Sequence, residues 1–254
     1  MHGRSIVMAA ALVLFGSLPV VSGQTLLLDD FTSDTALNTS LWTNQSPVLD
    51  ALLTNYTSAW MAPKLSFGPG GMQMSGVDAM EEFTGLASAQ TFTPPLTLTV
   101  TVEGAVANGN PFEVLLVNKD LSSMMSLIGN LNPANDPFYG IWMNYTHSGI
   151  MLHERGEVLF AQPAIKTVYT IQFSVDATGK GTVLLADANG ELLSLRTGLA
   201  VGTAPFHVVL AQREGLPQTV GKNIAIWHRA SVARGAIPPV KAAPATPEIH
   251  RDSR

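Results

Sequence analysis

Short stretches of alternating apolar and polar residues follow one another along most of this chain. In TVYTIQFSVD (167–176), Tyr169, Ile171, Phe173 and Val175 fall on one face, and smaller or more polar side chains fall on the other. A period of two predicts a strand with one packed and one partly solvated face, as is usual in antiparallel sheets. The same pattern, rich in β-branched and aromatic residues, predicts further strands. Their ranges are 25–31, 71–76, 88–92, 96–104, 112–118, 138–146, 149–155, 157–162, 180–187, 191–197, 206–214 and 224–232.

Turn signals separate these strands. The segments DATGKG (176–181) and DANGE (187–191) are hairpin connections, and Asn189-Gly190 is a strong signal for a two-residue turn. Only Asp120–Leu131 combines a capping residue with the apolar spacing of a helix. Many strands and almost no helix predict an all-β domain, built as two stacked antiparallel sheets or as a barrel.

Composition supports a well-packed domain. Charged residues make up 13% of the 254 residues, against ~25% in an average soluble protein, and hydrophobic residues make up 46%. The net charge is −5, and no run of Lys or Arg occurs. Nucleic-acid binding is therefore not expected, because it requires a basic surface that neutralises phosphates.

The first 23 residues have the pattern of a secretory signal peptide. His2 and Arg4 precede an apolar run from Ile6 to Phe15, and cleavage is expected before Gln24. The run is shorter than the ~20 residues that a membrane span needs, which favours a signal over the alternative, an N-terminal anchor. No later segment is apolar enough to cross a bilayer.

The pattern divides the chain into three parts. Residues 24–235 form one predicted domain, since neither an internal repeat nor a second core is evident. Residues 236–254 are rich in Pro and Ala and lack apolar periodicity, which predicts a disordered, extended tail. With the signal at 1–23, this organisation predicts a secreted or periplasmic protein.

The chain contains no cysteine. Disulfides, thiolate metal sites and thiol nucleophiles are therefore excluded. An exported domain that relies on core burial alone favours a bacterial envelope over an animal extracellular space.

Four parts of the chain resemble the concanavalin A-like lectin/glucanase superfamily. They are the opening LLLDDFTSDTALNTSLWT (26–43), an early hairpin region with MQMSG (72–76), EFTGLASAQTF (82–92) and LTLTVTVEG (96–104), the strand pair TVYTIQFSVDATGKGTVLLADANGE (167–191) and the closing NIAIWHRASVA (223–233). The resemblance is one of pattern and covers Thr25–Ala233. It implies a jelly roll of two curved antiparallel sheets, with a concave face that often holds sugar.

The laminarinases and lichenases of that superfamily carry E-x-D-x-x-E or E-x-D-x-E on one strand of the concave face. Superposed on DPFYGIWMNYTHSG (136–149), this pattern places Gly140, Trp142 and either Asn144 or Tyr145 at the acid positions. None of these can act as nucleophile or general acid, and retaining hydrolysis requires two carboxyl groups ~5–5.5 Å apart. No catalytic residue is therefore predicted.

The remaining acids and histidines do not replace that site. Glu113 has no acid two residues further along its strand and is expected to be a solvated surface charge. No metal-ligand spacing of histidines and no G-x-S-x-G turn occurs. The segment 129–138 offers Asp136 and several asparagines to calcium, but calcium usually takes several carboxylates. No cofactor is predicted, with calcium kept as an alternative.

Sugar binding needs an aromatic platform together with planar amide or guanidinium groups. Trp142 and Asn144 share one face of their predicted strand, and the other candidates lie on, or at the ends of, neighbouring strands. The predicted carbohydrate-binding set is Trp142, Asn144, His153, Gln172, Gln212 and Arg213. The alternative is that Trp142 fills the core and the others lie at the rim.

The leading hypothesis is an exported, non-catalytic domain that recognises a glycan or an envelope polysaccharide. An aromatic-lined concave cleft would favour it. The second hypothesis is a polysaccharide lyase or hydrolase with another site, such as His153 or Tyr145 with Arg213, which a cluster of these residues would favour. The third is a structural or protein-interaction domain, which a cleft filled with Met and Leu beside an exposed apolar patch would favour.

Overall fold

The computed structural model describes residues 24–44, 60–61, 63–75, 83–104, 110–117, 140–146, 149–152, 157–161, 167–213 and 222–235. These residues form strands and no helix. The strands are β1 Thr25–Asp29, β2 Trp42–Thr43, β3 Trp60–Met61, β4 Lys64–Gly68, β5 Gly71–Ser75, β6 Phe83–Ser88, β7 Leu96–Gly104, β8 Asn110–Val117, β9 Gly140–Thr146, β10 Gly149–Leu152, β11 Glu157–Phe160, β12 Val168–Val175, β13 Lys180–Ala186, β14 Leu192–Ala200, β15 His207–Arg213 and β16 Ala225–Arg234.

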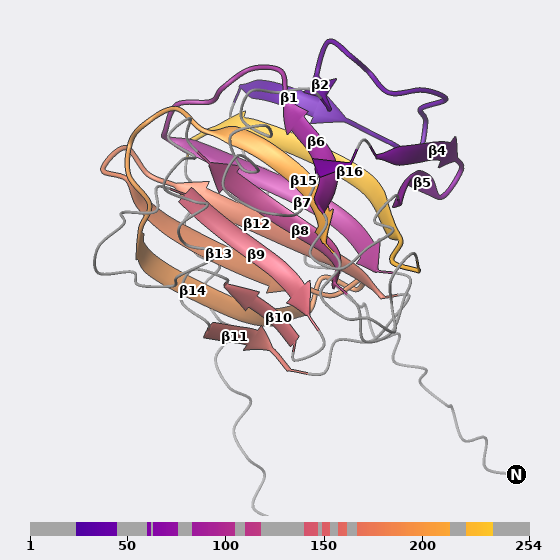
Figure 1. Ribbon diagram of the computed structural model, residues 1–254. Helices are drawn as coiled ribbons and strands as arrows, with labels where there is room; N and C mark the ends of the chain where they lie inside the picture. The colour runs from indigo at the N-terminus through magenta and orange to yellow at the C-terminus, as the bar shows by residue number, and fades with distance from the viewer. Residues whose placement is uncertain are drawn as a thin grey trace, which may run out of the picture.

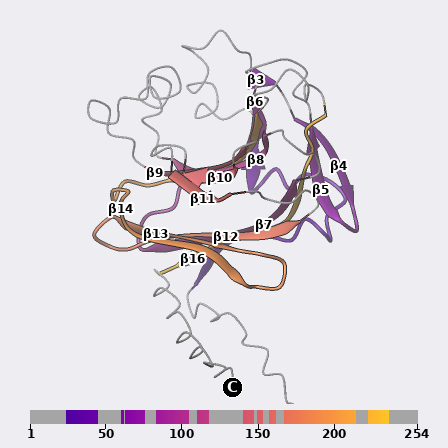
Figure 2. The same ribbon diagram turned by 90° about the horizontal axis from the view of Figure 1, so that it is seen from below.

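The strands form two sheets of eight (Figure 1). Sheet A has the order β14-β13-β12-β7-β16-β5-β4, with β1 beside β16. Sheet B has the order β11-β10-β9-β8-β15-β6-β2, with β3 beside β6. The pairs are antiparallel except β3 with β6. Figure 2 shows the two sheets as separate layers, so the expected two-sheet sandwich is confirmed and the barrel is not formed.

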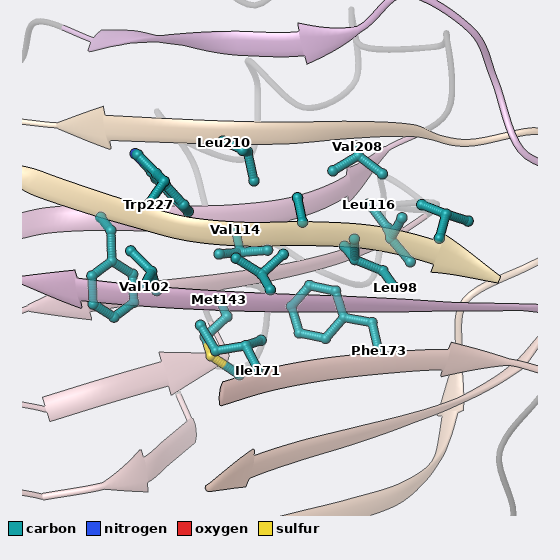
Figure 3. Close-up of a cluster of buried hydrophobic side chains, with 14 of the residues drawn as sticks. Leu98, Val102, Val114, Leu116, Met143, Ile171, Phe173, Val208, Leu210 and Trp227 are labelled. Carbon is teal, nitrogen blue, oxygen red and sulfur yellow. The ribbon is translucent and has the colours of Figure 1, made fainter. Parts of the chain in front are cut away.

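The core lies between the sheets, where alternate residues of facing strands meet (Figure 3). Leu98 of β7 and Phe173 of β12 come from sheet A, and Val114 of β8 and Leu210 of β15 come from sheet B; all four are fully buried. Each is flanked in sequence by residues of the opposite face, as the period-two pattern predicts. Burial of such side chains is the main stabilising contribution in a domain without disulfides.

One corner of the sandwich joins the two sheets through a hydrogen bond. Trp42 of β2, in sheet B, donates from Nε1 to Oδ2 of Asp29, at the end of β1 in sheet A, over 2.6 Å. The indole ring also packs against Phe31, with ring centroids 5.9 Å apart. Both rings belong to the core, so the N-terminal strand is held by packing as well as by pairing with β16.

The two predicted hairpin turns are present. Asp176 accepts hydrogen bonds from the backbone N–H groups of Thr178 and Lys180, and Asp187 accepts them from Asn189 and Glu191. Gly190 has φ +79°, a conformation that glycine adopts without the steric cost of a Cβ atom.

The predicted strands recur with small changes of boundary, apart from one. The expected strand at 88–92 is wrong: β6 ends at Ser88, and Phe92 makes only an isolated bridge with Phe206. The strands β2, β3, β4 and β6 were not predicted; the predicted strand at 88–92 shares only Ser88 with β6. The expected helix at 120–131, the signal at 1–23 and the tail at 236–254 lie outside the described residues. Within the described ranges, no helix is long and apolar enough to cross a membrane.

Candidate functional site

The face of sheet B that points away from the core is the candidate site, and it is called here the outward face. In β8, Val114 and Leu116 belong to the core, so Glu113, Leu115 and Val117 lie on the outward face. The neighbouring strand β15 continues this face, because Ala211 pairs with Glu113 in the register.

The register of β9 places two predicted site residues on the same face. Asn144 pairs with Glu113, and Trp142 pairs with Leu115. Met143, between them, belongs to the core. By the register, positions 142 and 144 therefore share one face of β9, as predicted.

Burial changes from one side of the outward face to the other. Leu115, Val117 and Val209 are at most 3% exposed although they point away from the core, so the face is covered over β8 and β15. On β11, by contrast, Val158 is 41% exposed. Since Val158 pairs with Met151 and Met151 pairs with Asn144, Val158 lies on the same face. Strand β9 thus lies between a buried and an exposed part of one surface.

Glu113 is the functional candidate that the sequence analysis missed. The expectation of a solvated surface charge is wrong, because the residue is fully buried. Its neighbours in the register are Asn144 on one side and Ala211 on the other. The sequence signal was its polar side chain within FEVLLV, which is otherwise apolar, but nothing in that stretch shows that the outward face is covered.

Gln212 has a structural role at the irregularity between β8 and β15. The register shifts between Ala211 and Arg213, so that Gln212 stands opposite both Pro111 and Phe112. Proline suits such a bulge because it has no N–H group to donate. The Gln212 side chain is fully buried and donates from Nε2 to the Pro111 carbonyl over 3.3 Å. It follows Leu210 on the inward face, so it does not join the outward set.

The other predicted residues divide between the two sheets. Arg213 pairs with Phe83 and lies at an outward position of sheet B, two residues beyond Ala211. Gln172 lies on sheet A, on the face away from the core, and donates from Nε2 to Oγ1 of Thr99 over 3.3 Å. His153 lies outside the described residues. The register therefore places Trp142 and Asn144 side by side on β9 and Arg213 two strands away on the same sheet, and it separates all three from Gln172 and Gln212.

Acidic groups are scarce on this face. Along β9 there is no acid, and Glu157 of β11 pairs with Leu152, a core residue. In the part of sheet B that the structure describes, Glu113 is the one carboxylate at an outward position. No group of three or more His, Asp or Glu that could hold a metal ion occurs among the described residues.

Known proteins share this architecture. No family model and no curated relative matches the chain. Among solved structures, peanut lectin is 11% identical with a TM-score of 0.55, and the match covers 85% of this chain and 99% of the lectin. The fold is the concanavalin A-like jelly roll.

Two glucanases share the jelly roll as well. Bacillus licheniformis β-glucanase is 13% identical with a TM-score of 0.52, over 84% of this chain and 99% of the enzyme. An endo-β-1,3-glucanase from Pyrococcus furiosus is 9% identical with a TM-score of 0.54, over 85% and 97%. The resemblance read from the sequence is thus confirmed at the level of the fold. Because lectins and glucanases both have this fold, the chemistry has to be argued from the outward face.

Proposed function

We propose that the protein recognises carbohydrate on the outward face of sheet B, around Trp142 and Asn144. The observation that carries the proposal is the position of β9, between the buried surface over β8 and β15 and the exposed surface at β11. From the exposed Val158 of β11, the outward face continues across Met151 of β10 to Asn144 of β9.

The residue types at these positions suit a sugar. A tryptophan ring offers a flat apolar platform for sugar C–H groups, and an amide offers both a donor and an acceptor for hydroxyl groups. Arg213, at an outward position of β15, adds planar donors at the far end of the same face. The solved structures with this fold include two plant proteins that are named as lectins.

Recognition without hydrolysis is supported by the count of acids. A retaining glycosidase needs two carboxyl groups at its cleft, and the described outward face offers Glu113 alone. We propose that the ligand is a glycan or an envelope polysaccharide. The chain meets this ligand after export, which the signal-like residues 1–23 direct.

A second function, binding of a protein partner or a structural role, is favoured by a different observation. The centre of the outward face is apolar and buried, with Leu115, Val117 and Val209 at most 3% exposed. The interaction-domain hypothesis predicted a cleft filled with Met and Leu beside an exposed apolar patch, and these three residues supply the covered apolar part of that prediction.

The test is a glycan array with the full chain, with and without calcium. The variants are Trp142→Ala and, as the matched control on the other sheet, Gln172→Ala. We expect selective binding that falls by roughly tenfold or more in Trp142→Ala, because aromatic anchors dominate binding surfaces. The control should bind like the parent. Binding to no glycan, or an equal loss in both variants, contradicts the proposal and favours the interaction domain.

A further inference from the structure

The strand β14 ends sheet A, and in the described part of the chain no strand pairs with its far side (Figure 1). An unpaired edge offers backbone N–H and C=O groups to a strand of another molecule, so proteins usually block long edges. β14 has nine residues, and its Leu192 is 40% exposed. Val158 of β11, the edge strand of sheet B that lies beside β14, is 41% exposed. Each sheet therefore ends on this side with an exposed apolar side chain.

Two positions of β14 that face the core hold polar residues. Ser194 stands opposite Leu185, and both point to the same side of the sheet, as directly opposed residues do. Arg196 stands opposite Val183 in the same way. Since Leu185 and Val183 belong to the core, Ser194 and Arg196 point inward. The period-two pattern places apolar residues at such positions, so core packing does not account for an arginine here.

The backbone carbonyl of Leu195 faces the free edge. Residues of an antiparallel strand bond alternately to the neighbour on one side and on the other. At the closing pair of the β13–β14 hairpin, the Asp187 N–H donates to the Glu191 carbonyl, so the odd-numbered residues of β13 bond toward β14. Leu195 stands opposite Leu184, an even-numbered residue, and its backbone groups therefore point away from β13.

The side chain of Arg196 covers this carbonyl. Its Nη1 donates to the Leu195 carbonyl oxygen over 2.9 Å and to Oγ of Ser194 over 3.2 Å. The two polar residues on the inward side of β14 thus act together, because the serine hydroxyl helps to hold the guanidinium group against the edge. An inward-pointing charge on an edge strand is one of the means by which proteins prevent edge-to-edge pairing.

The remainder of β14 is irregular. Its register with β13 shifts on both sides of the stretch from Ser194 to Thr197, and Gly198, just beyond this stretch, has φ +72°. Bulges bend and twist an edge strand, which makes it a poor template for a straight incoming strand. The regular stretch is the part of β14 that suits such a strand, and Arg196 lies within it.

We propose that Arg196 is a gatekeeper residue, which prevents a second copy of this chain from adding its own β14 to sheet A. Two β14 strands related by a two-fold axis would pair antiparallel and extend the sheet from one molecule to the other. The incoming strand needs the Leu195 carbonyl, which Arg196 occupies. It has to displace the guanidinium group from both acceptors or enclose its charge, and burial of a charge is costly. This role is independent of glycan binding, because β14 belongs to the other sheet.

The experiment is sedimentation velocity of the full chain over roughly a hundredfold range of protein concentration. Arg196→Val removes the charge and places a β-branched apolar residue in the regular stretch. Thr197→Val, the matched control, adds the same side chain to the other face of the same strand and leaves Arg196 in place. Arg196→Lys keeps a charged donor at the edge.

We expect Arg196→Val to self-associate at concentrations roughly tenfold or more below those at which the parent does, because a hydrogen bond to a charged group contributes about that much. Thr197→Val and Arg196→Lys should sediment like the parent. A folded Arg196→Val that sediments like the parent, or equal self-association of Thr197→Val, overturns the proposal.

A second measurement on the unaltered protein keeps the test independent of whether Arg196→Val folds. Guanidinium protons that are held by two acceptors exchange with water more slowly than those of an exposed arginine. We expect the ¹⁵N–¹H resonances of the Arg196 guanidinium group to persist at a pH where those of Arg229, an exposed residue of β16, are lost to exchange. Loss of both sets at the same pH contradicts the role of Arg196 at the edge.

Discussion

Aspartates in this chain differ in pKa according to what surrounds each carboxyl group. Asp176 is partly exposed and lies in a hairpin turn, where its carboxylate accepts hydrogen bonds from the Thr178 hydroxyl and from backbone N–H groups. These bonds favour the charged form and lower the pKa of Asp176. Asp29 shows the opposite shift, because burial disfavours the charged form.

The lowered pKa of Asp176 predicts a loss of stability at acid pH. A carboxyl group of this kind stabilises the folded state above pH 3.8, its unfolded value, and loses that contribution as the pH falls through its folded value. Asp176→Asn should therefore lose less stability than the parent between pH 4.5 and 2.5. The difference should be on the order of a few fold in the unfolding constant, because the site is exposed to solvent.

Thr178→Val serves as the matched variant for this turn. It removes the hydroxyl group that contributes most to the lowered pKa of Asp176. Its acid denaturation curve should lie between those of the parent and Asp176→Asn. Identical acid denaturation curves for all three proteins would show that the turn does not contribute to the pH dependence of stability.

At the scale of strands, close approach of neighbours limits which residues are allowed. Gly85 of β6 lies beside Ala211 of β15 on the outward face. A Cβ atom at position 85 would lie 2.5 Å from the Leu210 carbonyl oxygen and 2.9 Å from Cα of Ala211. Both contacts are with backbone, so a side chain there would push the two strands apart.

Gly85→Ala should therefore lower the free energy of unfolding by about 1–3 kcal/mol, the usual cost of overpacking. Gly70→Ala is the control, because a Cβ atom at that position meets nothing within 4 Å. It should change the unfolding free energy by less than about 0.5 kcal/mol. Urea unfolding at neutral pH measures both, and equal midpoints would contradict the steric argument.

The bulge between β8 and β15 makes a separate prediction. Gln212→Ala removes a buried side chain and the hydrogen bond to the Pro111 carbonyl, which should cost about 1–3 kcal/mol. Glycan affinity should stay unchanged at temperatures where the variant is folded, because Gln212 faces inward. Gln73→Ala, on the half-buried outer face of sheet A, is the stability control. A selective loss of affinity in Gln212→Ala would instead place Gln212 in the binding site.

For the whole molecule, the jelly roll provides two sheet faces that lie outside the core. The core between the sheets is continuous and apolar, which suits a chain without disulfides. The outward face of sheet B combines a covered apolar centre with an exposed margin at β11. The same fold occurs in a lectin and in a glucanase, so the fold alone does not assign a function.

Much of the fold could be predicted because strand and turn signals are local. The alternation in 167–176 gives the two faces of β12, and Asn189-Gly190 gives the turn after β13. The short strands β2 and β3 have only two residues each, too few for a period to be visible. The predicted strand at 88–92 was wrong because the strand of this region is formed by long-range pairing of 83–87 with β15 and of Ser88 with Trp42, which no local pattern shows.

By itself, the sequence determined which residues of a strand share a face, because that follows from the backbone period. The sequence therefore determined that Trp142 and Asn144 share a face of their strand. It also determined that Asp176 closes a turn. Only the tertiary structure decided which sheet each face belongs to and what covers it. Pairing between distant strands separated Gln172 from Trp142, buried Glu113 on the outward face, and brought Asp29 to Trp42. These contacts join residues far apart in the chain, and no local pattern encodes them.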